Sequence, residues 1–366
     1  MEWSDKFNSF NSEKGLAYID HYKNIVAWLD GRAKLLPPVE VNLDPIAECN
    51  LSCTFCITQR YLKAHREEVG EMRRLPTEYM YHLADFLAKW GVRGLCISGG
   101  GEPTLHDGAW GLTSYAAQRG MQVAWFTNAT NIKDKLAREF MKCRWVALSV
   151  DAGDRETYLK VKGADYFDRV VHNIGGLADL RGKIGSEVDL CFKFAVLPEN
   201  EQSIYQACLL AKELGVQSFH VRPVDFERDD VGGRKLELNL PLIQEQFQMC
   251  HELEDDNFKV FTVTHKFDPE FHVQHNFTQC LATPLILPIL SNGNVYICVD
   301  HKMEKDYLLG SAFPDPENIL KFWGSNAHRD LIKSVNISHC SRCTIGEYSH
   351  QIEKVVLNDG MFLSFP

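Results

Sequence analysis

The chain has 366 residues, of which 45% are hydrophobic and 24% are charged, a composition typical of a folded globular protein with a large core. Its 39 basic and 49 acidic residues give a net charge of −10, and the basic residues form no run that would follow a phosphate backbone. We therefore expect neither nucleic acid nor an anionic membrane surface as a partner.

The first residues contain no positive segment followed by an apolar stretch, and no apolar run approaches the ~18 residues that a membrane span needs. The sequence therefore predicts a cytoplasmic protein. That compartment keeps thiols reduced, so structural disulfides do not explain the 12 cysteines of the chain. Metal ligation is the leading explanation for most of them.

Short apolar segments alternate with amphipathic stretches in the first two thirds of the chain. The segments have the length and composition of strands, and the stretches between them, such as residues 77–91 and 203–216, have helical periodicity. This alternation predicts an α/β fold in which helices cover a parallel sheet and reactive groups lie at the carboxyl ends of the strands. The six predicted strands are residues 39–44, 93–100, 122–129, 144–151, 187–196 and 218–224.

Three cysteines, Cys49, Cys53 and Cys56, follow the first predicted strand in the stretch AECNLSCTFCITQR at residues 47–60. Three thiolates on such a loop suit three irons of a [4Fe–4S] cluster and leave the fourth iron open to a substrate or cofactor. Zinc is the alternative, but it usually takes four closely matched ligands, and this triplet has no local fourth one.

The pattern Cys49-x3-Cys53-x-Phe55-Cys56 resembles the signature of the radical S-adenosylmethionine (SAM) enzymes. The resemblance implies a partial (β/α)6 TIM-like barrel in which the open iron chelates SAM. In that family the reduced cluster cleaves SAM to methionine and a 5′-deoxyadenosyl radical, which takes a hydrogen atom from the substrate.

A glycine-rich stretch, ISGGGEPTL, ends the second predicted strand and resembles the GGE motif of the same family. Absent side chains would let backbone carbonyls approach the ammonium group of SAM. A simple strand-to-helix turn is the alternative for the glycines. The residues assigned to cofactor binding here are Gly99, Gly100, Gly101 and Glu102.

The ends of the later strands supply the remaining candidates. Ser149 and Asp151 share one face by strand alternation, and the resemblance places them near the ribose and methionine parts of SAM. Capping of the next helix is the alternative for Asp151. The resemblance makes Lys193 a candidate for the SAM carboxylate, and Asn128 and Arg222 complete the predicted cofactor-binding set.

Two further residues, Cys191 and His220, each have two predicted roles. Cys191 shares a face with Lys193 and is a candidate hydrogen-atom donor, with ordinary packing as the alternative. His220 shares a face with Arg222, and contact with SAM or substrate stands beside a surface or salt-bridged role for each of them.

A second cysteine set lies near the C-terminus. It consists of Cys280, Cys298, Cys340 and Cys343. Gly293 lies between the first two, at the turn of a predicted hairpin, and no cysteine follows the last. This resembles the twitch domain, the short form of the SPASM extension of radical SAM enzymes, which holds an auxiliary [4Fe–4S] cluster. A structural zinc site is the alternative.

The resemblance divides the chain into five predicted segments. They are an N-terminal helical leader at residues 1–38, a radical SAM partial barrel at 39–235, a helical connector at 236–279, a twitch domain at 280–350 and a C-terminal tail at 351–366.

We predict a radical SAM oxidoreductase or epimerase that uses SAM, two [4Fe–4S] clusters and a flavodoxin or ferredoxin-type electron donor. Only residues 1–38 precede the first strand, too few for the peptide-recognition module of many peptide-modifying relatives, which favours a small polar metabolite such as a sugar, aminocyclitol or nucleotide derivative. The final residues lack the Gly-Gly of the twitch enzymes that build molybdopterin precursor, which argues against that assignment. The alternatives are a maturase that modifies a ribosomal peptide and a non-catalytic Fe–S redox sensor.

Overall fold

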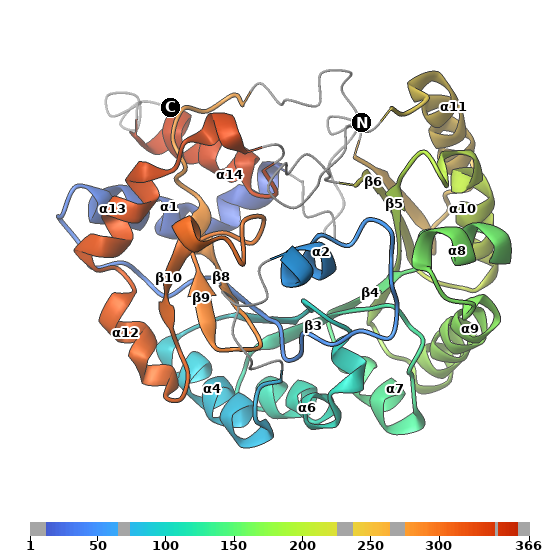
Figure 1. Cartoon of the computed structure of the whole chain (residues 1–366), viewed down its shortest axis with the longest axis horizontal. Coiled ribbons are helices and arrows are strands. Elements are labelled where there is room, and N and C mark those ends of the chain that lie inside the picture. The colour runs from blue at the N-terminus through green and yellow to red at the C-terminus, as the bar shows by residue number, and fades with distance from the viewer. Residues whose placement is uncertain (1–11, 65–73, 225–236, 264–274, 341–342, 358–366) are drawn as a thin grey trace.

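The fold is an open, curved sheet with helices on its outer side (Figure 1). The computed structural model describes residues 12–64, 74–224, 237–263, 275–340 and 343–357. Ten strands form one sheet in the order β10-β9-β8-β1-β2-β3-β4-β5-β6-β7, so the sheet does not close. The strands are β1 (Glu40–Leu43), β2 (Gly94–Ile97), β3 (Gln122–Thr127), β4 (Trp145–Ser149), β5 (Asp189–Val196), β6 (Ser218–Pro223), β7 (Lys259–Thr262), β8 (Ile286–Ile289), β9 (Asn294–Tyr296) and β10 (Leu308–Ser311).

The predicted α/β partial barrel is confirmed, because β1 to β6 fall inside the six predicted strands and pair in parallel in chain order. Helices α4, α6, α7, α9 and α10 lie along the convex side of the sheet in Figure 1. The helices are α1 (Ile19–Leu29), α2 (Ile57–Ala64), α4 (Thr77–Trp90), α5 (Asp107–Trp110), α6 (Leu112–Ala117), α7 (Asp134–Phe140), α8 (Arg155–Lys162), α9 (Phe167–Ile184), α10 (Ile204–Glu213), α11 (Leu240–His251), α12 (Ile319–Phe322), α13 (Asn326–Ser334) and α14 (Gly346–Gln351).

Alternation along β5 shows how the sheet separates a dry side from a polar side. Leu190, Phe192 and Phe194 are buried in the main hydrophobic core beneath the helices. Lys193 points to the opposite, inner side, where it pairs in register with Ser149 on β4 and with His220 on β6. Lys193 and its register partners Ser149 and His220 therefore lie near the strand ends, where the sequence predicts polar groups.

The C-terminal region continues the barrel sheet. β8 pairs in parallel with β1, and β9 returns antiparallel from it through a tight turn. Gly293 has a φ of +80° in that turn, as the predicted hairpin requires, and a Cβ there would lie 2.3 Å from the Cβ of Phe313. β7 was not predicted, and it extends the parallel sheet beyond β6 within the expected helical connector. The five segment boundaries stay predictions, and the end of the predicted barrel, at residues 225–235, lies outside the described residues.

The N-terminal leader packs against the C-terminal region. In α1 the Tyr22 hydroxyl donates to Gln351 Oε1 at 3.0 Å, and Trp28 Nε1 donates to the Gly324 carbonyl at 2.8 Å. These contacts join segments about 300 positions apart, so α1 and the C-terminal segments that it contacts depend on each other for burial. Among the described helices, none combines the length and apolarity needed to cross a membrane.

Candidate active site

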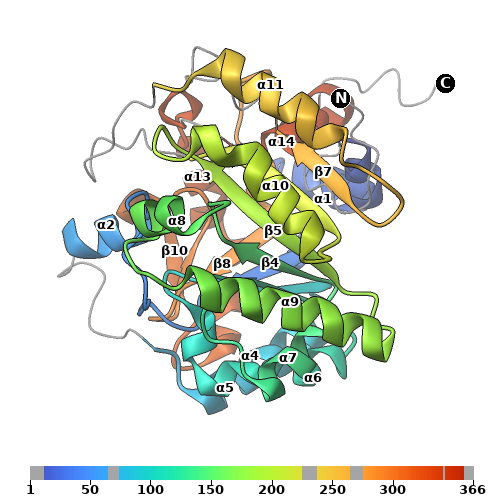
Figure 2. The same ribbon diagram turned by 90° about the vertical axis from the view of Figure 1, so that its right-hand side faces the viewer.

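The cysteine loop lies between β1 and α2, at the barrel mouth formed by the carboxyl ends of the strands. α2 occupies the centre of Figure 1 and the left edge of Figure 2, which identifies the mouth in both views. The C-terminal turn of α8 holds the loop, because Ser52 N donates to the Lys162 carbonyl at 3.1 Å and Thr54 N donates to the Val161 carbonyl at 3.0 Å. Two carbonyls left open by the helix end are thereby satisfied.

Backbone groups also point at the sulfur atoms. Leu51 N donates to Cys49 Sγ at 3.4 Å, and Gln59 N donates to Cys56 Sγ at 3.4 Å. Burial raises the pKa of the Cys53 thiol to about 11, and the positive charge of Lys162 opposes that rise. Donors and a cation around three thiols suit ligands that carry negative charge when a metal group is bound.

The spacing of the thiols tests what the loop would hold. Sulfur atoms bound to one zinc ion at ~2.3 Å are at most ~4.6 Å apart. Over the described ranges, the one set of three or more candidate ligand atoms within 4.8 Å of one another belongs to His82, Asp315 and Glu317. No three thiols of either cysteine set lie that close together in the described residues, and the choice between a zinc ion and an iron–sulfur cluster stays a prediction.

The glycine stretch packs on the strand end and loop that precede Cys49. Gly101 N donates to the Ile46 carbonyl at 2.9 Å, and Glu102 N donates to the Glu48 carbonyl at 2.8 Å. A Cβ on Gly101 would lie 2.0 Å from the Glu48 oxygen. These contacts give the glycines a role besides the predicted approach to SAM, which stays a prediction: they let two backbone segments meet beside the first cysteine.

We expect Gly101→Ala to displace the cysteine loop and to reduce the iron bound per chain after anaerobic reconstitution to less than about half. The reason is that backbone, unlike a flexible side chain, cannot move away from the added methyl group. Gly176→Ala is the matched control, since a Cβ at this exposed position in α9 meets nothing within 4 Å. That control should retain its iron and gain about 0.5–1 kcal/mol of helix stability. Normal iron content in the Gly101 variant would contradict the proposed contact.

Glu102 is buried, and its carboxylate accepts hydrogen bonds from other groups of the protein. Oε1 accepts hydrogen bonds from Thr104 N at 3.1 Å, Thr104 Oγ1 at 2.7 Å and Thr127 Oγ1 at 2.7 Å. Oε2 accepts from Asn128 N at 2.7 Å. Burial raises the pKa of Glu102, although these donors oppose the rise. The carboxylate therefore joins the ends of β2 and β3 at the mouth.

Asn128 links the end of β3 to the first cysteine. Its Nδ2 lies 3.9 Å from Cys49 Sγ and donates to Asn50 Oδ1 at 3.0 Å. Its Oδ1 accepts from Thr130 N at 3.0 Å, in a turn where Ala129 has a φ of +60°. The predicted cofactor role of Asn128 is untested, but the structure places its amide next to a candidate cluster ligand.

Asp151 differs from the predicted geometry. β4 ends at Ser149, and Asp151 has a φ of +60°, so strand alternation does not set its direction. Asp154, not Asp151, caps α8 by accepting from Thr157 N at 2.8 Å. Asp151 Oδ1 accepts from Ala195 N at 2.7 Å, and Oδ2 forms an ion pair with Lys162. Both carboxylate oxygens thus have protein partners, and contact with SAM stays a prediction for Ser149 and Asp151.

The inner face of β5 and β6 carries a basic group. Lys193 Nζ forms a hydrogen bond with His220 Nδ1, whereas Arg222 lies exposed two residues further toward the mouth. Cys191 lies two residues before Lys193, deeper in the barrel, and burial raises the pKa of its thiol. The structure therefore brings Cys191, Lys193 and His220 together, and their predicted roles remain untested.

The C-terminal region reaches the same mouth. Asp44 directly follows β1, and its Oδ2 forms an ion pair with Lys302 Nζ at 2.8 Å. Ser98 Oγ donates to Asp44 Oδ1 at 2.9 Å. A Cβ on Gly100 would lie 3.2 Å from Met303 Cε, so this loop covers the middle glycine of the GGG stretch. A segment distant in sequence therefore forms part of the barrel mouth.

We expect Lys302→Met to lower the free energy of unfolding by about 2 kcal/mol, because it leaves the buried Asp44 carboxylate without its cation. Adding Asp44→Asn should recover part of the loss, giving a coupling energy above about 1 kcal/mol in a double-mutant cycle of denaturant unfolding. Additive losses would mean that the two side chains do not interact.

The four C-terminal cysteines are brought together from separate segments. Burial raises the pKa of Cys280 to about 12, and the nearby Cys340 raises it further. Burial also raises the pKa values of Cys298 and Cys343, and Cys280 adds to both. Thr344 N and Oγ1 donate to Asp300 at 2.7 and 2.5 Å, which ties the segment after Cys298 to the segment after Cys343.

Sequence reasoning did not single out Lys162, Asp44 or Lys302. A signal existed for Lys162, which stands four residues after the buried Tyr158 on the inner face of α8, where an apolar residue is expected. No local signal marks the other two, because their contact spans 258 positions.

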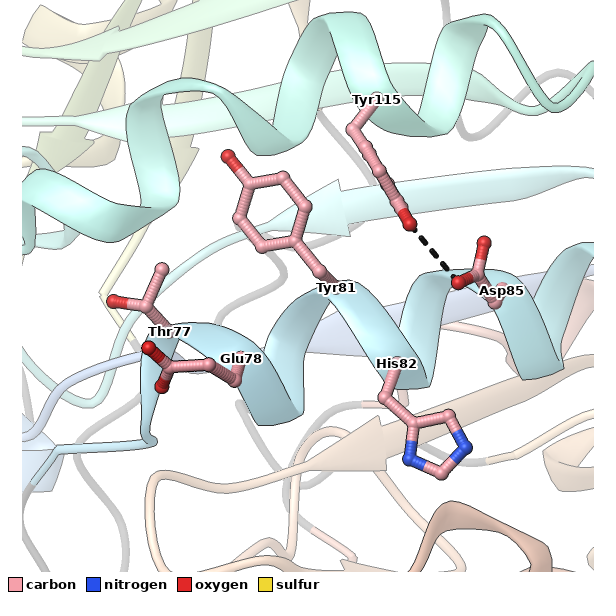
Figure 3. Close-up of a pocket in the computed structure, with 6 residues that line it drawn as sticks. All are labelled: Thr77, Glu78, Tyr81, His82, Asp85 and Tyr115. Carbon is pink, nitrogen blue, oxygen red and sulfur yellow. Dashed lines mark hydrogen bonds between the residues drawn. The ribbon is translucent and has the colours of Figure 1, made fainter.

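A shallow pocket lies elsewhere on the surface, between α4 and α6 (Figure 3). Tyr81 of α4 and Tyr115 of α6 line it, and the Tyr115 hydroxyl donates to Asp85 Oδ2 at 2.9 Å. His82, Asp315 and Glu317 are exposed nearby, and exposed groups of this kind are common without an ion. None of the predicted site residues belongs to this pocket.

Comparison with known proteins agrees with the geometry of the mouth. Residues 44–211 match the family model of the Radical SAM superfamily. A probable GTP 3′,8-cyclase of Saccharolobus solfataricus is 29% identical over 177 residues, which are 47% of this chain and 53% of that protein. The chain thus spans about half the length of the cyclases it matches. The mycofactocin maturase MftC of Mycobacterium tuberculosis is 24% identical over 308 residues, 81% of this chain and 73% of that protein.

A solved structure shows the same fold. The crystal structure of Streptococcus suis SuiB bound to S-adenosylmethionine superposes with a TM-score of 0.66 at 19% identity, covering 91% of this chain and 76% of that chain. At this identity the likeness shows a shared fold. Residues 44–211 form a domain of the Radical SAM superfamily, a family that implies SAM and one [4Fe–4S] cluster as cofactors.

Proposed function

We propose that the protein is a radical SAM maturase that modifies a peptide substrate. The main support for this proposal is the sequence similarity to MftC. That similarity covers 81% of the chain and so extends well beyond the radical SAM domain at 44–211. The fold of SuiB, which has been solved with its precursor peptide SuiA, supports the same reading over 88% of the chain. The small-metabolite substrate expected from the short N-terminal leader is less favoured by these likenesses.

In this proposal Cys49, Cys53 and Cys56 hold the SAM-binding [4Fe–4S] cluster, and the four C-terminal thiols hold an auxiliary one. The reduced first cluster, when bound, supplies the electron that cleaves SAM to methionine and a 5′-deoxyadenosyl radical. The protein residues orient the reactants: Glu102 and Asn128 fix the mouth beside Cys49, and donors at Leu51 and Gln59 face the sulfur atoms.

The inner wall of β5 and β6 would receive the substrate. Lys193 and His220 place a cationic group on this wall, and we assign it to the carboxylate of SAM or of the peptide. Cys191 lies two residues before Lys193 on the same face of β5, and we assign its thiol as the candidate hydrogen-atom donor. A flavodoxin or ferredoxin-type protein would supply the electrons.

The proposal is tested by incubating the reconstituted protein anaerobically with SAM and dithionite, alone and with short peptides encoded beside its gene. We expect formation of 5′-deoxyadenosine and a mass change in one peptide. A mass change in GTP or another nucleotide instead, which the 29% identity with the cyclases makes the second candidate, would overturn the peptide assignment and keep the radical SAM class. No 5′-deoxyadenosine with any of these substrates would overturn both.

A further inference from the structure

A buried ion pair lies directly beneath the cysteine loop. Lys162 is 2% exposed and Asp151 is 3% exposed, and their side chains contact each other as the last residue of α8 meets the segment after β4. Both charges have left water, which costs several kcal/mol per ion unless the pair is well bonded. Replacement by apolar side chains is often as stable, so stability alone does not account for such a pair.

The lysine belongs to the wall of the cluster site. Its carbonyl accepts from Ser52 N at 3.1 Å, and its Nζ lies 5.4 Å from the centre of the Phe55 ring. Phe55 stands between the second and third cysteines of the triplet and packs against Val161 and Leu197. The ammonium group therefore lies next to the loop segment that connects two of the three candidate ligands (Figure 2 shows α8 beside this mouth).

The two charges of the pair face different parts of the site. Lys162 Nζ lies over the ring of Phe55, which stands between Cys53 and Cys56. Asp151 Oδ1 accepts from Ala195 N at 2.7 Å, so the carboxylate is held by β5. Within a poorly hydrated site a fixed charge beside the cysteine loop acts strongly.

We propose that Lys162 is a positioning residue that holds the cysteine loop and raises the reduction potential of the cluster bound there. The negative charge of Asp151 opposes this effect on the potential. This inference rests on the [4Fe–4S] cluster of the proposed function. Reduction adds one negative charge to the cluster, so a nearby cation favours the reduced state and a nearby anion disfavours it. Because the ammonium group faces the cysteine loop and the carboxylate is bonded to β5, the pair favours the electron uptake that must precede cleavage of SAM.

The sign of the charge distinguishes this role from simple support of the fold. Lys162→Met should lower the midpoint potential of the cluster, and Asp151→Asn should raise it. A structural role alone would move the potential in the same direction in both variants or leave it unchanged. We expect about a tenfold change in the reduction equilibrium for Lys162→Met, which is ~59 mV for one electron.

The experiment is a redox titration of the reconstituted full-length protein, followed by electron paramagnetic resonance without SAM, so that cofactor contacts of Asp151 do not enter. Each measurement is made in a Cys298→Ala background, so that the signal of the first cluster is read alone. Lys162→Arg keeps the charge and should retain the wild-type potential. Lys160→Met removes the same charge from an exposed position of the same helix and should leave the potential unchanged.

The double variant Lys162→Met with Asp151→Asn should bind iron as the wild type does and should titrate slightly below it, which keeps the test open if the single Lys162 variant folds poorly. Shifts of the same sign in the two single variants, or no shift in the double and single variants, would overturn the inference. Absence of any cluster in the Cys298→Ala parent would instead overturn the proposed function.

Discussion

Cys56→Ala is expected to abolish 5′-deoxyadenosine formation, lowering it more than about 1,000-fold, and to reduce the iron content from about eight to about four atoms per chain. Two thiolates cannot hold a cube that must also leave one iron open for SAM, so the first cluster is lost as a unit. Anaerobic iron and sulfide analysis, together with chromatographic detection of 5′-deoxyadenosine, measures both effects.

Cys298→Ala is the informative comparison, because it removes one buried thiol of the second set. Its iron content should fall by the same amount, but 5′-deoxyadenosine formation should stay within about threefold of the wild type while modification of the substrate is lost. Cys143→Ala, a buried core cysteine outside both sets, should change neither quantity. Bound zinc in place of iron at either set would contradict the cluster assignment.

The six β/α units could be predicted because the periodicity of apolar residues and the turn residues are local signals. The predicted ends of each strand agree with the observed ends within a few residues. β7 escaped prediction because its four residues are short and lie between a helix and a segment without a clear period. The extension of the sheet through β8 depends on pairing with β1 across more than 240 positions, and no local pattern encodes such a partner.

The candidate site also contains some residues that local sequence signals mark and others that only tertiary packing brings together. The cysteines, the glycines and Glu102 are adjacent in sequence to strand ends, so their convergence at the mouth follows from a parallel sheet. The prediction for Asp151 takes its direction from strand alternation, and the positive φ of this residue breaks that alternation. Its partner Lys162, and the pair of Asp44 with Lys302, arise from tertiary packing that sequence spacing does not describe.

Glu102→Gln is expected to raise the KM for SAM at least about tenfold and to lower the free energy of unfolding by about 2 kcal/mol. The carboxylate accepts from three donors at Oε1 and from Asn128 N at Oε2, whereas an amide offers one acceptor oxygen only. If that oxygen keeps the three donors, the amide NH2 faces Asn128 N, and a buried donor loses its partner. The turn beside Cys49 must then move.

The control for Glu102→Gln is Glu139→Gln. Glu139 also accepts from a backbone N–H and a hydroxyl, both of Ser114, at 3.0 and 2.6 Å, but it lies on α7, on the outer side of the sheet. Its loss should lower stability without changing the KM for SAM, because the partners of Glu139 are Ser114 on α6 and Lys142 after α7, away from the β3 end that Glu102 holds. Equal changes in KM for the two variants would show that general loosening of the fold, and not the position of the β3 end, limits SAM binding. An unchanged KM for SAM in the Glu102 variant would show that the Glu102 carboxylate does not position the barrel mouth for SAM binding.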